Sequence, residues 1–331
     1  MSERPPEFRI WAVGVLFLGL AGFIGYILPR TDDAKVAQAG AGASTAKSAN
    51  AKSSDSKTTQ GEKTFTPPPD DKIPNNEFGA MVKLGRDIFH DTQRNAKQFV
   101  GNSLQCSNCH IDAGRLANSA PLWAAYVAFP TYRAKNAHVN TFQERMQGCF
   151  LYSMNGKAPA LGDKVLVAIE SYAYYLAKGA PTGANLPGRG YPKIPKVAKL
   201  DYANGQQVYA QKCALCHGVD GQGQRAADGT TVFPPLWGKD SFNWGAGMGS
   251  ITNATGFIKA NMPLSQGNTL SDQEAWDVAT YIDSQERPQD PRFKGSVADT
   301  RKAHHDSPMD MYGTMVNGVL LGQNSSPSGL K

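Results

Sequence analysis

Two copies of one short motif, C-x-x-C-H, constrain this chain more than any other feature. They occupy positions 106–110 and 213–217 and use four of the five cysteines. Two thiols one helical turn apart can each bond a vinyl group of one porphyrin, and the histidine that follows can bind the iron as proximal ligand. The motifs therefore predict two covalently bound haem c groups, with their iron. The residues expected to hold them are Cys106, Cys109 and His110 in the first copy and Cys213, Cys216 and His217 in the second.

Other uses of paired cysteines fit the sequence less well. A zinc site would have to bring together two pairs that lie far apart, although each pair has its own histidine. A thioredoxin-type site would need a βαβ context, which the sequence does not offer. Five cysteines in 331 residues are too few for a disulfide scaffold, and the net charge of +6 comes without a basic block, so no nucleic-acid partner is expected.

The surroundings of the two motifs also repeat. Apolar residues in 81–88 have helical spacing before the first motif, and Gly85 and Gly205 stand at matching places before the two motifs. An amphipathic run follows each motif, at 165–172 and at 271–282, and the second run opens with a capping-box pattern. The repeat predicts a mainly α fold with two tandem cytochrome c-like domains.

The N-terminal region contains an uncharged, mostly apolar run at 10–28. At about 1.5 Å per residue, this run is long enough to cross the roughly 30 Å core of a bilayer. Arg4 and Arg9 precede it and acidic residues follow, so the body of the chain is expected on the outer side of the inner membrane. A cleaved signal peptide is the alternative, although the nearest small-residue site, 37–39, lies far from the run. We therefore expect a periplasmic protein anchored by an N-terminal helix.

Composition sets the remaining boundaries. Residues 34–72 are mostly low-complexity Ala, Gly, Ser, Lys and Thr, which predicts a flexible linker, and Pro and Gly concentrate again in 181–200. The expected organisation is a cytoplasmic N-terminus at 1–9, an anchor or signal peptide at 10–28, a linker at 34–72, a first cytochrome c domain at 73–180, an inter-domain linker at 181–200, a second cytochrome c domain at 201–290 and a C-terminal extension at 291–331 that wraps the surface.

Each haem iron also needs a sixth ligand. In the second half, Met262 lies just before the closing helix, the usual place of the distal methionine in small cytochromes c, and Met248 is the alternative. In the first half there are four candidates, and the spacing from His110 by itself favours Met154. The four are His138, Met146, Cys149 and Met154.

Three runs, at 140–157, 238–248 and 257–263, resemble the thiosulfate dehydrogenase family. The first contains a Cys-Phe-x-x-Ser-Met-Asn-Gly stretch that generic cytochromes c lack. Members of this family are dihaem cytochromes c in which a cysteine of this stretch ligates the catalytic haem, so the resemblance implies that Cys149 is both a distal ligand and the reactive sulfur. Some members have a lysine ligand just before the methionine of the second haem. This chain has Asn261 there, which favours Met262.

The resemblance implies an enzyme that couples two thiosulfate ions into tetrathionate and releases two electrons. A thiolate ligand gives the first haem a low potential and methionine gives the second a higher one, so electrons are expected to pass from the first haem to the second. A periplasmic or membrane-bound cytochrome would then accept them. The preferred direction, thiosulfate oxidation or tetrathionate reduction, stays open.

Two dianions at one site require positive charge. Arg145 lies one helical turn before Cys149 and can share its face, and a guanidinium suits sulfonate oxygens as it suits phosphate. Charges of this kind are also common on solvated surfaces. The candidates for substrate binding are the cations Arg133, Lys135 and Arg145 and the neutral donors Ser153 and Asn155.

Two other functions remain as alternatives. One is a membrane-tethered dihaem electron carrier without a substrate of its own. The other is a cysteine-ligated subunit of a sulfur-oxidising complex whose partner carries the substrate. Cys149 separates an enzyme from a carrier, because a carrier needs neither a thiolate ligand nor a cationic pocket. His304 and His305, in the C-terminal extension, are expected to be surface residues.

Overall fold

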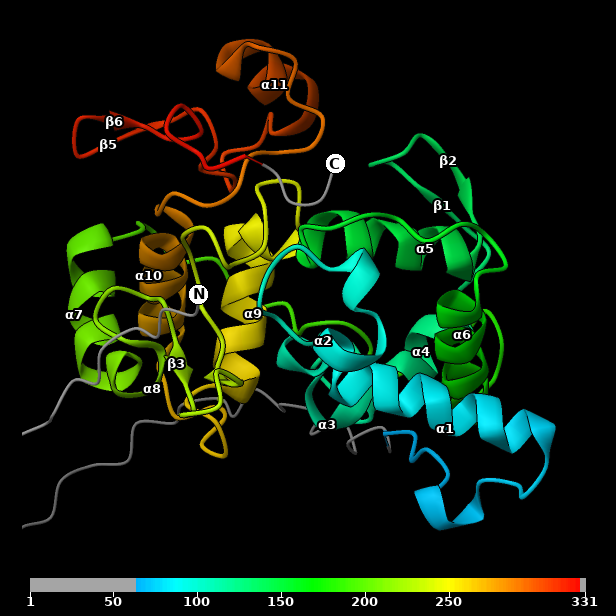
Figure 1. Ribbon diagram of the computed structural model, residues 1–331. Helices are drawn as coiled ribbons and strands as arrows, with labels where there is room; N and C mark the ends of the chain where they lie inside the picture. The colour runs from blue at the N-terminus through cyan, green and yellow to red at the C-terminus, as the bar shows by residue number, and fades with distance from the viewer. Residues whose placement is uncertain (1–63, 328–331) are drawn as a thin grey trace, which may run out of the picture. The chain divides into compact units, whose positions relative to one another are not determined.

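The computed structural model describes residues 64–327 (Figure 1). The expected N-terminus at 1–9, the anchor at 10–28 and the linker up to residue 63 lie outside the described residues. Within 64–327, no helix is both long and apolar enough to cross a bilayer. The described part is mainly helical, and its strands form short antiparallel pairs.

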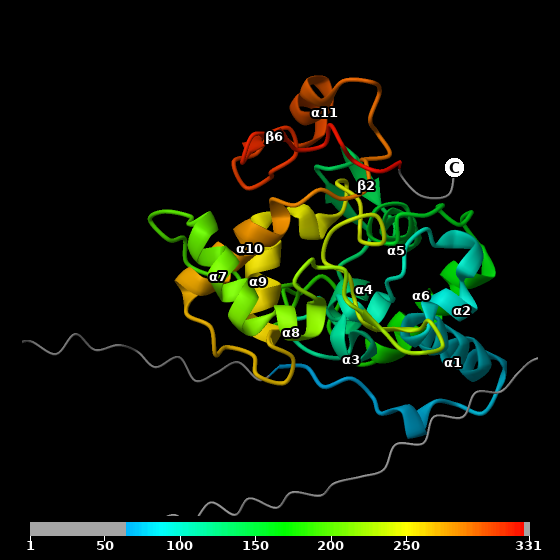
Figure 2. The ribbon, with the colours of Figure 1, turned by 60° about the vertical axis from the view of Figure 1, so that its left-hand side comes forward.

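Two helices frame the first C-x-x-C-H motif. Helix α1 spans Glu77–His90 and is capped by Asn76, and helix α6 spans Lys164–Leu176. The two helices pack against each other through their apolar faces (Figures 1 and 2). Gly85 permits this close approach, because a Cβ at its position would lie 2.0 Å from the Ala168 carbonyl oxygen.

The same arrangement surrounds the second motif. Helix α7, Tyr202–Lys212, packs against α10, Asp272–Asp283, and a Cβ on Gly205 would lie 2.0 Å from the Asp277 carbonyl oxygen. Helix α10 begins with the capping box expected from the sequence, in which Ser271 and Glu274 exchange hydrogen bonds with each other's backbone N–H. Helix α10 also packs against α9, Ile251–Asn261.

Shorter elements connect these helices. The helical ones are η1 at Asp70–Lys72, α2 at Thr92–Asn95, η2 at Lys97–Phe99, η3 at Cys106–Asn108, α3 at Ile111–Gly114, α4 at Leu122–Tyr126, α5 at Phe142–Gly148, the π-helical turn η4 at Cys149–Ser153, α8 at Ala214–His217, η5 at Gly247–Gly249 and α11 at Val297–His304. The paired strands are β1 Thr131–Arg133 with β2 His138–Asn140, β3 Gln224–Arg225 with β4 Thr231–Phe233, and β5 Met315–Val316 with β6 Val319–Leu320.

Buried apolar side chains form separate clusters around the two motifs. Trp123 and Tyr172 lie fully buried in the first cluster and Trp276 lies in the second. Met248 packs against both clusters, so this segment touches the surroundings of each motif. A third, smaller cluster contains Trp244 and Tyr312, which join the C-terminal extension to the rest of the described chain.

The C-terminal extension is more tightly built than the sequence predicts. The expectation that His305 is a surface residue was wrong, because His305 is only 3% exposed. Its Nε2 lies 2.9 Å from an Asp290 carboxylate oxygen and its Nδ1 lies 2.7 Å from one of Asp310. Each ring nitrogen has a carboxylate partner, and these hydrogen bonds offset the free-energy cost of burying the imidazole. Its neighbour His304 is exposed, as expected.

Buried amides connect segments that are far apart in the sequence. The Asn102 side chain donates to the carbonyl oxygens of Ser153, at 2.8 Å, and of Ser241, at 3.1 Å. The Asn243 side chain donates to the Asn155 amide oxygen at 3.0 Å. Segment 238–248 is therefore fixed against the turn that carries Cys149.

Candidate haem and substrate site

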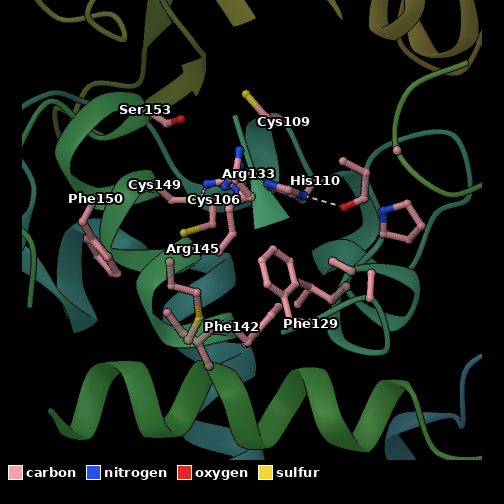
Figure 3. A pocket seen from close by; sticks show the side chains of 18 of the residues that line it. Cys106, Cys109, His110, Phe129, Arg133, Phe142, Arg145, Cys149, Phe150 and Ser153 are labelled. Atoms are coloured by element: carbon pink, nitrogen blue, oxygen red, sulfur yellow. Dashed lines mark hydrogen bonds between the residues drawn. The ribbon is translucent and has the colours of Figure 1, made fainter. Parts of the chain in front are cut away.

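A cavity of about 530 Å³ lies beside the first C-x-x-C-H motif. Cys106, Cys109 and His110 contribute to its lining, and Cys149 faces them from η4. Figure 3 shows these side chains converging on the cavity, together with aromatic rings from α5 and from the loop before β1. A mostly apolar wall with both motif thiols and the histidine on it fits a covalently attached porphyrin.

The first motif histidine is held in the orientation that iron ligation needs. The Nδ1 of His110 lies 2.7 Å from the Ala120 carbonyl oxygen, the contact drawn as a dashed line in Figure 3. Burial lowers the pKa of His110 to about 4, so the ring is neutral near pH 7. A proton fixed on Nδ1 leaves the Nε2 lone pair for the iron.

The histidine of the second motif makes the same kind of hydrogen bond. The Nδ1 of His217 lies 2.9 Å from the Pro234 carbonyl oxygen, and burial lowers the pKa of this histidine as well. Two histidines that follow C-x-x-C pairs therefore share one hydrogen-bonding pattern. Both sets of residues fit haem c, with a backbone carbonyl as the partner that orients each ring.

Cys149 meets Arg145 at the edge of the first cavity. Helix α5 ends at Gly148 and the π-helical turn begins at Cys149, so the Arg145 guanidinium reaches the sulfur, with Nη1 2.8 Å from Sγ. The other three candidates for this position have different surroundings. Met146 and Met154 are buried in the first apolar cluster although they also touch the cavity, and His138 is exposed and lies 3.4 Å from Glu144.

Two further cations lie on the hairpin formed by β1 and β2. Arg133 lines the cavity, and its pKa is lowered by burial and by the neighbouring Arg145. Lys135 is exposed as a residue, yet its ammonium group lies 4.0 Å from the Tyr152 ring centre and donates to the Gly245 carbonyl oxygen. This burial of the ammonium group, with Arg292 close by, lowers the pKa of Lys135 to about 8.

The two neutral donors predicted for substrate binding have different positions. Ser153 lines the cavity at the end of η4. Asn155 is 2% exposed and lines neither this cavity nor the second cavity described below. Its amide oxygen accepts a hydrogen bond from Asn243, and its left-handed φ of 45° shapes the turn. A contact between Asn155 and substrate stays a prediction.

A second cavity, of about 410 Å³, adjoins the first and involves residues that sequence reasoning missed. Arg292 and His304 reach it from the C-terminal extension, more than 130 positions after the hairpin that they face. No motif surrounds either residue. Their place in the site follows only from the way the extension folds back.

The sequence favours Met262 over Met248 as the distal ligand in the second half, and the structure describes both. Met262 follows the last residue of α9 and packs against the second apolar cluster. Met248, in η5, packs against both clusters. Ligation by Met262 stays a prediction.

Comparison with known proteins agrees with this geometry. Residues 200–282, around the second motif, match the family described as cytochrome C oxidase, cbb3-type, subunit III, so a cytochrome c-like domain is present. The thiosulfate dehydrogenase of Thiomonas intermedia (strain K12) is 61% identical over 264 residues, which cover 80% of this chain and 84% of that protein. The chain belongs to the thiosulfate dehydrogenase family.

Two further matches support this membership. The thiosulfate dehydrogenase of Stutzerimonas stutzeri (strain A1501) is 55% identical over 80% of this chain and 86% of its own length. The solved structure of the "as isolated" form of a thiosulfate dehydrogenase (TsdBA) from Marichromatium purpuratum matches with a TM-score of 0.75 and 49% identity. That match covers 78% of this chain, which spans just over half, 57%, of the solved chain. Covalently bound haem c, expected from the motifs, is confirmed for this family member.

Proposed function

We propose that this protein is a dihaem cytochrome c enzyme that couples two thiosulfate ions into tetrathionate and passes the two electrons to a cytochrome acceptor. The balance is two S₂O₃²⁻ giving S₄O₆²⁻ and two electrons. Family membership gives the reaction class. The observation that carries the proposal for this chain is the 2.8 Å contact between Arg145 and Cys149 at a cavity that also holds the first motif.

Cys149 supplies the sulfur on which the coupling proceeds. The terminal sulfur of one thiosulfate forms a bond to the Cys149 thiolate as two electrons leave, which gives a Cys–S–S–SO₃⁻ adduct. A second thiosulfate then attacks the adduct, forms the new S–S bond of tetrathionate and returns the Cys149 thiolate, as in thiol–disulfide exchange. Bound haem c supplies the one-electron acceptors, and Cys149 is proposed as the distal ligand of the first.

The cations make the approach of two dianions possible. Arg145 orients the sulfur through its hydrogen bond, and Arg133 and Lys135 place positive charge beside the same cavity. Ser153 offers a hydroxyl to a sulfonate oxygen from the end of η4. A pure electron carrier, the alternative, would derive no benefit from a guanidinium on an unpaired cysteine.

The second half is proposed to deliver the electrons outward. Two tandem cytochrome c domains at 73–180 and 201–290 would each hold one haem, with Met262 as distal ligand of the second. Methionine ligation by Met262 would give the second haem a higher potential than thiolate ligation by Cys149 gives the first, which would favour electron transfer toward the second half.

We place the protein in the periplasm, anchored to the inner membrane by residues 10–28. The apolar run and the arginines before it support this placement. Membrane fractionation checks it: the mature protein should sediment with membranes and keep its first residues. A soluble form that begins near Gly40 would instead identify a cleaved signal peptide.

Replacement of the proposed reactive sulfur tests the function. Cys149→Gly should abolish thiosulfate-dependent reduction of an electron acceptor while both haems stay attached, because the four motif cysteines are untouched. Haem content and tetrathionate formation are measured on the same holoprotein. Arg145→Lys is the matched comparison, since it keeps a charge but loses the guanidinium geometry and should retain part of the activity.

Two results would contradict the proposal. One is full thiosulfate activity in Cys149→Gly with two haems bound. The other is a wild-type holoprotein that exchanges electrons with cytochromes but oxidises no thiosulfate and reduces no tetrathionate. In either case the tethered electron carrier would be the better account.

A further inference from the structure

We propose that the second cavity is a sulfonate subsite, completed by Arg292 of the C-terminal extension, that holds the end of the substrate or product farther from Cys149. The inference rests on the proposed function, because it assigns the second thiosulfate, and the matching half of tetrathionate, to a particular place. The ligand class is a sulfur oxyanion with a terminal –SO₃⁻ group.

The two cavities share part of their walls. The two cavities are therefore neighbours, and an anion that extends past the shared side chains would have one end beside Cys149 and the other in the second cavity. Tetrathionate is such a molecule, since it carries a sulfonate at each end of a sulfur chain. The residues that line both cavities are Arg133, Lys135, Arg145 and Ser153.

The second cavity has an excess of positive charge. Arg292 adds a guanidinium to the three shared cations, and the acidic residue on its wall is Glu144. The Glu144 carboxylate is already used at the start of α5, where it accepts from the Thr141 N–H at 2.6 Å. Several cations around a solvent-connected hollow attract a dianion more strongly than any one of them would.

Arg292 is held in place before any ligand arrives. Asp290 is fully buried, and its carboxylate accepts from Arg292 Nε at 3.0 Å and Nη2 at 2.6 Å. The same carboxylate contacts His305, which fixes it from the other side. The Arg292 guanidinium carbon lies 5.2 Å from the centre of the Tyr152 ring, the ring that also contacts Lys135.

This support explains why Arg292 is suited to bind an anion rather than only to pair with Asp290. Its contacts with Asp290 use Nε, Nη2 and the backbone N–H, and within residues 64–327 no hydrogen bond uses Nη1, so Nη1 can meet a ligand. A guanidinium that is already oriented loses less conformational entropy on binding than a free surface arginine. Because Asp290 neutralises part of the charge of Arg292, the contribution of Arg292 to anion binding is expected near the lower end of the range for a charged hydrogen bond.

The test measures tetrathionate binding by titration calorimetry in the ferric Cys149→Gly holoprotein, which has no sulfur for exchange with the ligand. Adding Arg292→Gln should weaken tetrathionate binding about tenfold, the effect of one charged hydrogen bond. Arg292→Lys should restore part of the affinity. Lys294→Gln is the matched control, because Lys294 is exposed on the same segment, carries the same charge and does not line the cavity.

A second variant tests the subsite without disturbing the contacts of Asp290. His304 is exposed and lines the cavity, so His304→Glu should place a repelling charge beside the ligand, and His304→Gln should not. Haem absorbance spectra should be the same in all variants. With Cys149 present, Arg292→Gln should raise the KM for thiosulfate and leave the spectra unchanged.

The outcomes separate the subsite from the proposed function. If Arg292→Gln and His304→Glu both bind tetrathionate within twofold of the parent, the subsite is overturned even where the wild type oxidises thiosulfate. If the wild type oxidises no thiosulfate and reduces no tetrathionate while Arg292 and His304 still govern tetrathionate binding, the proposed function fails and the oxyanion subsite stands. Equal losses in Lys294→Gln and Arg292→Gln would show only long-range charge attraction and would also overturn it.

Discussion

At the scale of single residues, the site depends on one turn of helix. Arg145 and Cys149 are four positions apart, so helical geometry brings the guanidinium to the sulfur. The chain changes from α-helix to π-helical turn at Cys149, and π-helical turns are often found at functional sites. The pKa of Lys135, by contrast, is lowered mainly by burial and then by the nearby charge of Arg292, which is distant in sequence. The Tyr152 ring lies 4.0 Å from its ammonium group.

Lys135 predicts a pH dependence of substrate binding. Its ammonium group is charged below its pKa of about 8 and neutral above it, so it attracts thiosulfate below that pH. The charged groups that face it are Arg292, Asp290, Arg145 and Arg133. The Kd of the ferric Cys149→Gly holoprotein for thiosulfate should therefore rise as pH increases through about 8.

Lys135→Gln is the control for this effect. It should bind thiosulfate more weakly at pH 7 and should lose the change in Kd near pH 8, because the titrating group is gone. A Lys135→Gln protein whose Kd still rises near pH 8 would show that another group is responsible.

At the scale of elements, one packing device occurs twice. Gly85 on α1 and Gly205 on α7 each face a backbone carbonyl oxygen of the helix packed against them, at a distance that a methyl group could not occupy. Close contact between the two helices of each pair lets their apolar side chains pack tightly against each other. This packing fixes the helix that precedes each motif. Both glycines could be picked out from the sequence, because they stand at matching positions before the two C-x-x-C-H motifs.

Replacement of either glycine should therefore destabilise the fold. In Gly85→Ala and Gly205→Ala, the new Cβ would meet a backbone oxygen at 2.0 Å, which forces the helices apart and costs about 1–3 kcal/mol or more. Thermal unfolding of the holoprotein should show a lower Tm for both variants. Gly247→Ala is the control, because its nearest neighbour would be 3.9 Å away, and an equal loss of Tm there would argue against the packing explanation.

At the scale of the whole described chain, segment 238–248 and the C-terminal extension connect the surroundings of the two motifs. Asn243 contacts the turn after Cys149, Met248 touches both apolar clusters, and Arg292 reaches the second cavity. Side chains from distant parts of the sequence thus join the proposed substrate site near the first motif to the proposed electron exit near the second.

Variants of the two methionines test the proposed exit of electrons. Met262→Gly should lower the reduction potential of one haem and slow electron transfer to an acceptor, because loss of a methionine ligand removes the factor that raises the potential. Met248→Gly should leave both potentials near their original values. Redox titration followed by absorbance distinguishes the two haems, and the reverse pattern would make Met248 the ligand.

The sequence by itself determined the chemistry that depends on local spacing. The histidine of each C-x-x-C-H motif is held by a hydrogen bond to a backbone carbonyl oxygen. The mainly helical fold and the capping box at Ser271 are confirmed. Arg145 lies beside Cys149, as helical periodicity predicts. The C-x-x-C-H spacing, the capping box and the Arg145–Cys149 pair each involve residues within about one helical turn of each other, so short-range geometry is sufficient to predict them.

Only the tertiary structure decided which side chains share a cavity across long sequence distances. Asn155 belongs to the same Cys-Phe-x-x-Ser-Met-Asn-Gly stretch as Cys149, yet its side chain contacts Asn243. His305 is buried because Asp290 and Asp310 satisfy its two ring nitrogens. Arg292 reaches the hairpin of Lys135 because Asp290, anchored in turn by His305, holds its guanidinium there. Such contacts depend on how distant segments pack, and no local pattern of residues records that packing.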